Sequence, residues 1–474
     1  MGISTLDWRR PSAWADRLVP APVRSRFHEP YSKLTRAADL VALGEGEAAR
    51  AQRMALFAFC VRIASAALAY LSQVFLARIL GGFEYGVFVL VWTVVLIAGY
   101  LSCLGFPSSI VRFVPRYRVR RDADGLRGVV LGARLIAGGV ATVIAFLATA
   151  LLWFAPDVVA SYYVLPFFVA LVCLPVLAIG DVQDGISRSF DLKGPALVPT
   201  FLLRPALVLA AMVVAILSGW PTTATTALGA TVVAAWATTI VQLIWLARGT
   251  RSAVERGPRR SEPRVWLAVS LPIFLVEGFF QLLTNIDILM VGRAMSPEDV
   301  AVYFAAVKTL ALVHFVYFAV KAGAAHRYSH YHEAGDSTAY EDFVRRTVGW
   351  TFWPSLLMGA LIVLVGPVLL DLFGEGFSRG APLLWILVIG IVARSAVGPA
   401  EAVLTMSGEQ NACAIVYALT LLVNVALNLT LLPLYGLHGA AVATCCALIF
   451  EALGLFAIVR RRLGFSMFVG SRSS

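Results

Sequence analysis

The chain has 474 residues, of which 59% are hydrophobic and only 14% charged, and its mean hydropathy is +0.80. These values exclude an ordinary water-soluble globular protein. The apolar residues come in blocks long enough to cross a bilayer, which takes about 20 helical residues. Because backbone polar groups in lipid must be hydrogen-bonded within their own segment, we predict that these blocks are α-helices. The expected class is an all-α, multi-pass membrane protein.

The apolar blocks predict about twelve transmembrane helices, separated by short connections that carry Gly or Pro, such as "SGWPTT" (218–223). In chain order, the expected helices are 54–78, 84–106, 127–154, 161–181, 196–218, 222–247, 265–291, 299–325, 343–370, 380–405, 411–433 and 437–459. The expected organisation is an N-terminal tail (1–53), a first six-helix half (54–247), a basic linker (248–264), a second six-helix half (265–459) and a C-terminal tail (460–474).

The net charge of +11 raises the question of nucleic-acid binding, and the distribution of the charge argues against it. Of the 39 Lys and Arg residues, five lie inside the predicted helices and three, Arg78, Arg293 and Arg379, lie on one side of the membrane. The remaining 31 lie on the other side, which is the positive-inside pattern. We therefore expect both tails to be cytoplasmic, the protein to be in the cytoplasmic (inner) membrane, and no nucleic acid among its partners.

One short segment occurs twice. After a shift of 215 positions, "LARILGGFEYGVF" (76–88) aligns without a gap with 291–303, the start of "VGRAMSPEDVAVYF" (291–304). The repeat predicts two copies of one six-helix bundle in the same orientation, an arrangement found in many transporters. In each copy the segment is a tight break between the first two helices, so we expect paired outer-side hinges. The hinge candidates are Arg78, Gly81, Gly82, Gly86, Arg293 and Pro297.

The segment "FLARILGGFEYGVFVLVWTVV" (75–95), followed by "LGFPSSIVRFVPRY" (104–117), resembles the N-terminal signature of the polysaccharide transporter family. That family of lipid-linked oligosaccharide flippases belongs to the multidrug/oligosaccharidyl-lipid/polysaccharide (MOP) flippase superfamily. The second half carries similar family stretches in the same order, including "EAVLTMSGEQN" (401–411), so the resemblance covers roughly 54–460. It implies two pseudo-symmetric six-helix lobes around a central cavity. The implied activity is transfer of a lipid-linked oligosaccharide across the membrane by alternating access.

Basic residues inside the predicted helices are costly in a bilayer and usually mark a pathway. A lipid-linked sugar presents a pyrophosphate, which guanidinium groups bind through paired hydrogen bonds. We therefore expect four substrate-binding residues: Arg62, Arg204, Lys308 and Arg394. Arg134 has a similar depth, but its side chain can extend to the cytoplasmic surface.

Acidic residues inside the helices suggest coupling to H⁺ or Na⁺. The ion-coupling candidates are Glu277, Asp287 and Glu401. For Glu277 a second interpretation stands equally, an ion pair with Lys308 or Arg394. The Asn and Thr residues at helical spacing either line the pathway or join helices through hydrogen bonds.

The sequence contains no phosphate-binding loop, no dinucleotide fingerprint and no lipase motif, so we expect neither an enzyme nor an organic cofactor. The loop "HRYSHYHEAGD" (326–336) lacks a zinc-ligand pattern and predicts no metal site. The alternative function is a cation-coupled exporter of small amphipathic molecules; a membrane glycosyltransferase is disfavoured because no large soluble loop is present. Expected partners are the lipid-linked oligosaccharide, membrane lipids and polysaccharide polymerase or export machinery.

Overall fold

A computed structural model describes residues 47–251, 257–334 and 337–470. Every regular element in this part of the chain is helical, as predicted. The chain divides into two units, Met1–Ala67 and Leu68–Ser474. Of the first unit only the start of the first helix, from Glu47, is described. All contacts discussed below lie within the second unit.

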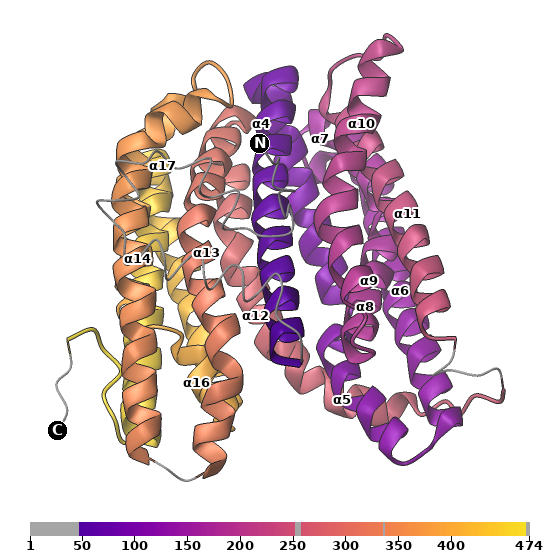
Figure 1. Cartoon of the computed structure of the whole chain (residues 1–474). Helices are drawn as coiled ribbons and strands as arrows, with labels where there is room; N and C mark the ends of the chain where they lie inside the picture. Colours follow the sequence, from indigo (N-terminus) through magenta and orange to yellow (C-terminus); the bar gives the residue numbers. More distant parts are fainter. Residues whose placement is uncertain (1–46, 252–256, 335–336, 471–474) are drawn as a thin grey trace, which may run out of the picture. The chain divides into compact units, whose positions relative to one another are not determined.

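The first half of the chain forms helices that pack on one another, with α8 contacting α5, α6 and α11 (Figure 1). Their bounds are α4 Glu47–Ser102, α5 Phe106–Val119, α6 Ala123–Phe154, η1 Pro156–Val158, α7 Ser161–Leu171, α8 Leu174–Ser189, α9 Lys193–Val198, η2 Pro199–Leu203, α10 Arg204–Leu217 and α11 Ala224–Gly249. The short element η2 is a turn of π-helix.

The second half forms a second packed group, in which α17 contacts α12 and α15, and α13 contacts α14. Its helices are α12 Pro263–Ala294, α13 Pro297–Ala334, α14 Ser337–Asp371, η3 Phe377–Gly380, α15 Ala381–Ser395, α16 Ala400–Met406 and α17 Gln410–Arg462. The two groups match the predicted halves, and α12 of the second also contacts α5 of the first.

Within the described residues, nine helices are long and apolar enough to cross a membrane, or ten if the bent pair α7 and α8 is one span. Two helices, α4 and α17, are too long for a single crossing. The 53 residues of α17 would span about 80 Å at 1.5 Å per residue, whereas the hydrocarbon core of a bilayer is about 30 Å thick. Non-helical glycines divide these two, Gly81 in α4 (φ 74°) and Gly436 in α17 (φ 59°). Counting each as two spans gives about twelve, in agreement with the sequence.

Two expected boundaries differ from the structure. Residues 326–334, expected in a cytoplasmic loop, continue helix α13. The helix expected to end at 181 continues as α8 to Ser189, which brings one further aspartate, Asp184, into a helical span. Hydropathy failed at both places because polar residues at the end of a long helix lower the local average although the backbone hydrogen bonding continues.

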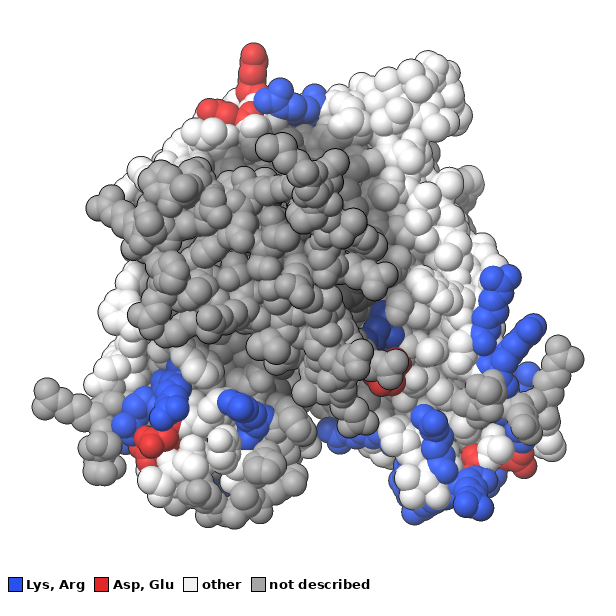
Figure 2. Space-filling view, viewed as in Figure 1, with Lys and Arg blue, Asp and Glu red and all other residues white. Residues whose placement is uncertain are grey.

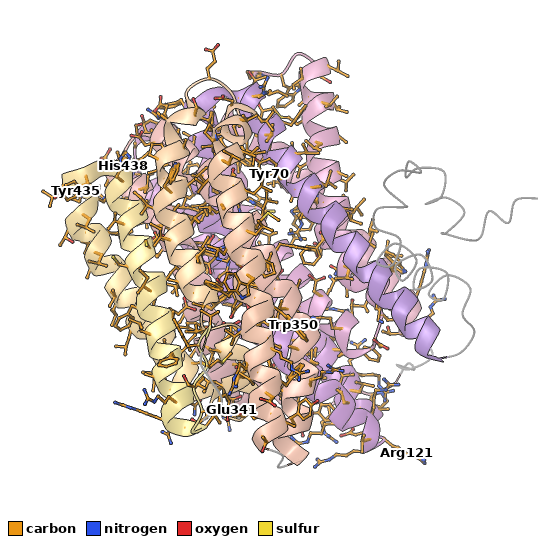
Figure 3. All side chains as sticks on the ribbon, turned by 60° about the vertical axis from the view of Figure 1, so that its left-hand side comes forward. Tyr70, Arg121, Glu341, Trp350, Tyr435 and His438 are labelled. Carbon is orange, nitrogen blue, oxygen red and sulfur yellow. The ribbon has the colours of Figure 1, made fainter. Side chains whose placement is uncertain are left out.

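The polar ends of the helices point to the two faces of a membrane. Arg121 and Glu341 lie at one end of the helices, Tyr435 and His438 at the other, and Trp350 lies between (Figure 3). Lys and Arg side chains gather mainly at the end where α5 lies, with few at the opposite end (Figure 2). Between the ends, large apolar side chains such as Leu364 and Trp153 are exposed. Such an exposed apolar face is suited to lipid rather than water.

Candidate functional site

The two copies of the repeated segment meet at the end opposite α5. A Cβ atom on Gly86 would lie 1.7 Å from the carbonyl oxygen of Pro297, so the backbones of α4 and α13 are in direct contact there. Gly82 faces the side chain of Glu298 at an ordinary 3.6 Å. Three of the predicted hinge residues are thus contacts between the halves, and their movement as hinges stays a prediction.

Arg78 connects the same two halves. Its Nε donates to the carbonyl oxygen of Leu372 over 2.7 Å and its Nη2 to that of Asp371 over 3.2 Å. These are carbonyls at the C-terminal end of α14, where a helix accepts cations favourably. The counterpart Arg293 is exposed at the end of α12. The repeat therefore supplies two arginines, of which Arg78 joins the halves.

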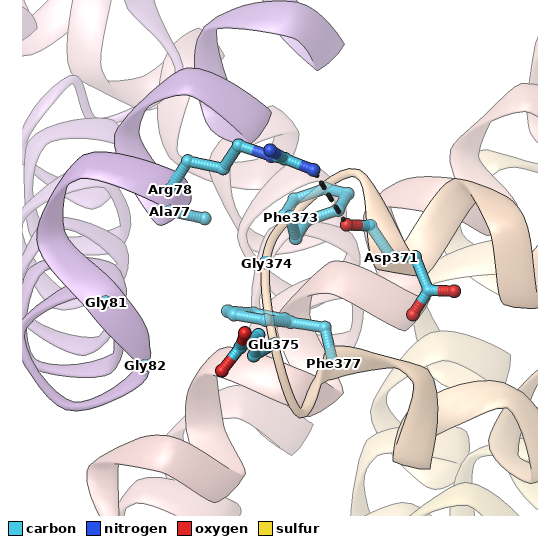
Figure 4. A pocket seen from close by; sticks show the side chains of 9 residues that line it. All are labelled: Ala77, Arg78, Gly81, Gly82, Asp371, Phe373, Gly374, Glu375 and Phe377. Atoms are coloured by element: carbon cyan, nitrogen blue, oxygen red, sulfur yellow. Dashed lines mark hydrogen bonds between the residues drawn. The ribbon is translucent and has the colours of Figure 1, made fainter.

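A pocket of about 650 Å³ lies beside this contact, between the bend of α4 and the segment 371–377 (Figure 4). Its walls include Gly81 and Gly82 on one side and Phe373, Glu375 and Phe377 on the other. The positive φ of Gly81 turns the backbone at the pocket wall, a conformation that glycine adopts without cost. Arg78 lines this pocket and donates its hydrogen bonds to the end of α14, so the pocket lies at the contact between the halves.

Asp287 of α12 is the centre of a buried polar cluster in the second half, and it is only 6% exposed. Its Oδ2 accepts a hydrogen bond from Thr444 over 2.8 Å and its Oδ1 accepts from Asn428 Nδ2 over 3.2 Å. Asn428 also donates to Asn424 Oδ1 over 2.8 Å, and Tyr303 OH lies 2.9 Å from Thr444 Oγ1. The cluster joins α12, α13 and both parts of α17.

Oxygen atoms dominate this cluster, and the Oδ1 atom of Asn428 is buried without a hydrogen-bond partner. An unpaired buried acceptor is costly, and hard cations favour carboxylate, amide and hydroxyl oxygens. The arrangement fits a monovalent cation, or a proton on Asp287. The predicted role of Asp287 in ion coupling thus has a suitable geometry, and the predicted Asn/Thr stripe is part of the same cluster.

Arg394 of α15 is 7% exposed and lies between two carboxylates. Its Nη2 is 2.9 Å from Glu451 Oε1 and 3.7 Å from Glu401 Oε2, and its guanidinium lies 4.8 Å from the ring centre of Tyr317. Glu401 also accepts hydrogen bonds from Lys321 and Tyr417. The charge of Arg394 is therefore neutralised by the protein itself, and its partners are Glu451 and Glu401 rather than the predicted Glu277.

This network lies at a break in the chain between α15 and α16. Gly398 (φ 58°) and Pro399 interrupt the helix, and the carbonyl oxygen of Ala396 accepts a hydrogen bond from the backbone N–H of Val469 over 3.0 Å. Met467 is buried beside this contact at 1% exposure. The segment after α17 therefore folds back onto the second half and pairs a carbonyl that the break leaves free.

Glu277 of α12 pairs with neither Lys308 nor Arg394. Its carboxylate accepts hydrogen bonds from Tyr100 of α4 over 3.2 Å and from Ser108 of α5 over 2.5 Å. The predicted ion pair is therefore wrong for this conformation, and Glu277 instead joins α12 to the first half. Its predicted role as a coupling carboxylate stays a prediction.

Arg204 and Lys308 differ from Arg394 because no ion pair is found for either of them among the described residues. Arg204 begins α10 directly after the π-helix, and its Nη2 lies 3.6 Å from a Cβ built on Gly180. Lys308 lies near the middle of its span, over the ring of Phe304 at 4.8 Å. Arg62, the fourth predicted substrate-binding residue, has a side chain outside the described residues.

Two acidic residues near Arg204 were missed by the sequence reading. Asp184 of α8 accepts hydrogen bonds from Thr200 over 3.1 Å and from Gln242 Nε2. Asp181 lies one turn earlier on the same helix and interacts electrostatically with Arg204. The available signal was the spacing of Asp181 and Asp184, which an extended α8 places on one face beside Arg204.

The fold resembles solved membrane transporters over most of their length. A multidrug resistance MATE family transporter in an inward-facing conformation superposes with a TM-score of 0.73 at 16% identity, covering 84% of this chain and 94% of that chain. The lipid II flippase MurJ in an inward closed conformation gives 0.66 at 13% identity, with 85% and 87% covered. A MOP superfamily transporter from Pyrococcus furiosus gives 0.64 at 17% identity, with 85% and 93% covered.

The long apolar helices define a multi-pass membrane protein, and its fold resembles that of solved MOP superfamily transporters. The sequence profile of the polysaccharide biosynthesis protein family matches residues 53–325, more than half of the chain, and the MatE profile matches residues 272–430. The chain belongs to the polysaccharide biosynthesis protein family. A search of curated proteins finds no match. The family and the similar structures are transporters and flippases rather than enzymes.

Proposed function

We propose that this protein moves a polyprenyl-pyrophosphate-linked oligosaccharide across the cytoplasmic membrane, for exopolysaccharide, capsule or O-antigen synthesis. Both termini are cytoplasmic in this proposal, as the distribution of Lys and Arg indicates. Family membership supports the substrate class. The export partners would be the polymerase and secretion machinery of the same polysaccharide.

The proposal rests on a contrast among the basic residues inside the membrane-spanning helices. Arg394 has two carboxylate partners, whereas none of the described residues forms an ion pair with Arg204 or Lys308. A cation without an ion-pair partner at membrane depth is costly. Asp181 and Asp184 offset part of the charge of Arg204 electrostatically, but neither forms an ion pair with it. A pyrophosphate supplies two or more negative charges, which Arg204 and Lys308 would neutralise while the prenyl chain stays in lipid. Arg62 and Arg394 remain proposed binding residues, Arg394 only after its ion pairs rearrange.

Energy for uphill transport would come from an ion gradient through the Asp287 cluster. The buried, unpaired Oδ1 of Asn428 and the carboxylate of Asp287 are oxygen ligands suited to Na⁺, and Asp287 alone could carry H⁺. Glu277 and Glu401 are secondary coupling candidates, because both hold hydrogen bonds between helices that alternating access would change.

The test uses proteoliposomes that contain the purified full chain and a fluorescent polyprenyl-pyrophosphate sugar. A membrane-impermeant quencher reports how much of the fluorescent lipid is in the outer leaflet. Arg204→Gln and Lys308→Gln should each lower transbilayer movement at least tenfold. Arg264→Gln, at an exposed position in the first turn of α12, is the matched control and should retain the wild-type rate. Wild-type movement in both deep-cation variants would contradict the proposal.

The second candidate is cation-coupled export of small amphipathic molecules, favoured by the MatE profile match and the superposition on the MATE transporter. The same vesicles, loaded with a cationic dye and given a Na⁺ or pH gradient, separate the two functions. Gradient-driven dye efflux without movement of the lipid-linked sugar would favour the exporter. In either case Asp287→Asn should remove the dependence on the gradient.

A further inference from the structure

A second pocket lies on the outer surface of the first half, near the C-terminal end of α11. It has a volume of about 330 Å³ and is lined by Val241, Ile244, Trp245 and Arg248. The spacing i, i+3, i+4 and i+7 places these four residues on one face of the helix. Ligand pockets begin at about 300 Å³, so the volume suits a small group or part of a chain.

The surrounding surface faces lipid. The apolar residues Trp236 and Ile240 continue the same side of α11 away from the pocket, and both are more than 40% exposed. Arg248, in the last turn of α11, provides the positive charge at the polar end. The pocket is therefore apolar toward the membrane interior and basic toward the membrane surface.

Trp245 is held in place by close packing. A Cβ atom on Gly194 of α9 would lie 2.8 Å from Cζ2 of the Trp245 ring, so the ring lies against the backbone of α9. Trp245 as a whole is nevertheless 41% exposed. Within the described part of the chain, neither the indole N–H nor the guanidinium of Arg248 has a hydrogen-bond or ion-pair partner. Two donors thus remain unpaired at the basic end of an apolar pocket.

We propose that this pocket binds one anionic glycerophospholipid of the surrounding bilayer. Its phosphate is held by Arg248 and the Trp245 N–H, and an acyl chain lies along Val241 and Ile244. Trp and Arg favour the interface between headgroups and hydrocarbon, and basic pockets at helix ends bind anionic headgroups. One cation matches the single charge of a phosphodiester and not the higher charge of a pyrophosphate. The site is thus distinct from the proposed path of the transported substrate.

The test measures lipid binding to the delipidated full-length protein by native mass spectrometry, with phosphatidylglycerol and phosphatidylcholine as probes. We expect tighter binding of phosphatidylglycerol, and Arg248→Gln should weaken it about fivefold while leaving phosphatidylcholine unchanged. A photoactivatable phosphatidylglycerol should crosslink to the peptide that contains residues 241–248. Arg264→Gln serves as the control, because Arg264 is equally exposed but lies outside the pocket.

Three results would overturn the proposal. The first is unchanged phosphatidylglycerol binding in Arg248→Gln. The second is an equal loss in Arg264→Gln, which would show that only the general surface charge matters. The third is loss of crosslinking at residues 241–248 when an equimolar polyprenyl pyrophosphate is added before irradiation, which would assign the pocket to the transported lipid. Because the assay reads lipid binding and not transport, failure here leaves the proposed transport function untouched.

Discussion

Gly86 of α4 and Pro297 of α13 are in backbone contact, so closely that a Cβ atom on Gly86 would lie 1.7 Å from the Pro297 carbonyl oxygen. The two residues belong to the two copies of the repeated segment, 76–88 and 291–304. The two copies of the repeated segment therefore contact each other, and the glycine at position 86 permits this close approach. Only a residue without a side chain permits two helices to touch through their backbones.

Gly86→Ala should force this contact open, because the obstructing atoms are backbone and cannot rotate away. We expect a loss of about 1–3 kcal/mol, measured as a lower thermal unfolding temperature of the purified protein in detergent. Gly82→Ala is the matched control: its Cβ would lie 3.6 Å from the Glu298 side chain, an ordinary contact. Equal stability of the Gly86 variant and the wild type would show that the contact is not maintained in solution.

Replacing Arg394 alone should destabilise the protein more than replacing Arg394 together with its partner Glu451. Arg394→Met leaves Glu451, which is 1% exposed, without its closest cation and should lower the free energy of unfolding by about 3–5 kcal/mol. The double variant Arg394→Met/Glu451→Gln leaves no such charge, while Glu401 keeps its pair with Lys321. It should therefore recover part of the loss in thermal unfolding. A double variant no more stable than the single one would contradict this assignment.

The turn between α5 and α6 should respond to acid. The backbone N–H of Gly125 donates to Asp122 and Arg260 pairs with it, and together they lower the pKa of Asp122 from its usual 3.8. A lowered pKa means that the stabilisation is present above the unfolded-state pKa and is lost as the pH falls through the folded-state value.

Wild type should accordingly be more stable than Asp122→Asn at pH 7, and the difference should shrink as the pH falls below about 4 and vanish once the pH is below the lowered folded-state pKa of Asp122. Asn remains a good N-terminal cap, so the variant removes the charge and keeps the capping geometry. Thermal unfolding at a series of pH values checks this. A difference that does not change with pH would mean that the charge on Asp122 contributes nothing.

The segment after α17 should stabilise the break between α15 and α16. Met467→Ala should cost about 2–5 kcal/mol, because Met467 is buried at 1% exposure in the cluster below the break. Met467→Leu keeps the volume and should cost less than about 1.5 kcal/mol. Hydrogen exchange of 396–406 should also become faster in the Ala variant. Unchanged exchange there would show that the segment does not support the break.

Much of the fold could be predicted from the sequence because a bilayer leaves few alternatives. Long apolar blocks must become helices, and their approximate number followed from block length. The repeat at Arg78 and Arg293 predicted two related halves, and the helices on either side of residues 250–262 pack mainly within their own group. Where polar residues extended a helix, as in 182–189 and 326–334, hydropathy gave the wrong end.

The partners of the charged side chains could not be predicted. The sequence places Glu277, Lys308 and Arg394 at similar depth, and several pairings were compatible with that depth. The fold selects Tyr100 and Ser108 for Glu277, and Glu401 and Glu451 for Arg394. Asp287 and Asn428 are 141 residues apart, and no local pattern reports their contact.

Composition and periodicity thus determined the class of protein, the helices and their division into halves, since these depend on transfer of each segment into lipid. The tertiary structure decided which buried cations form ion pairs with carboxylates, as Arg394 does with Glu451. That outcome depends on the rotation and mutual approach of helices distant in sequence. Glycines such as Gly86 and Gly398 set those approaches, and their effect is visible only when the opposing backbone is in place.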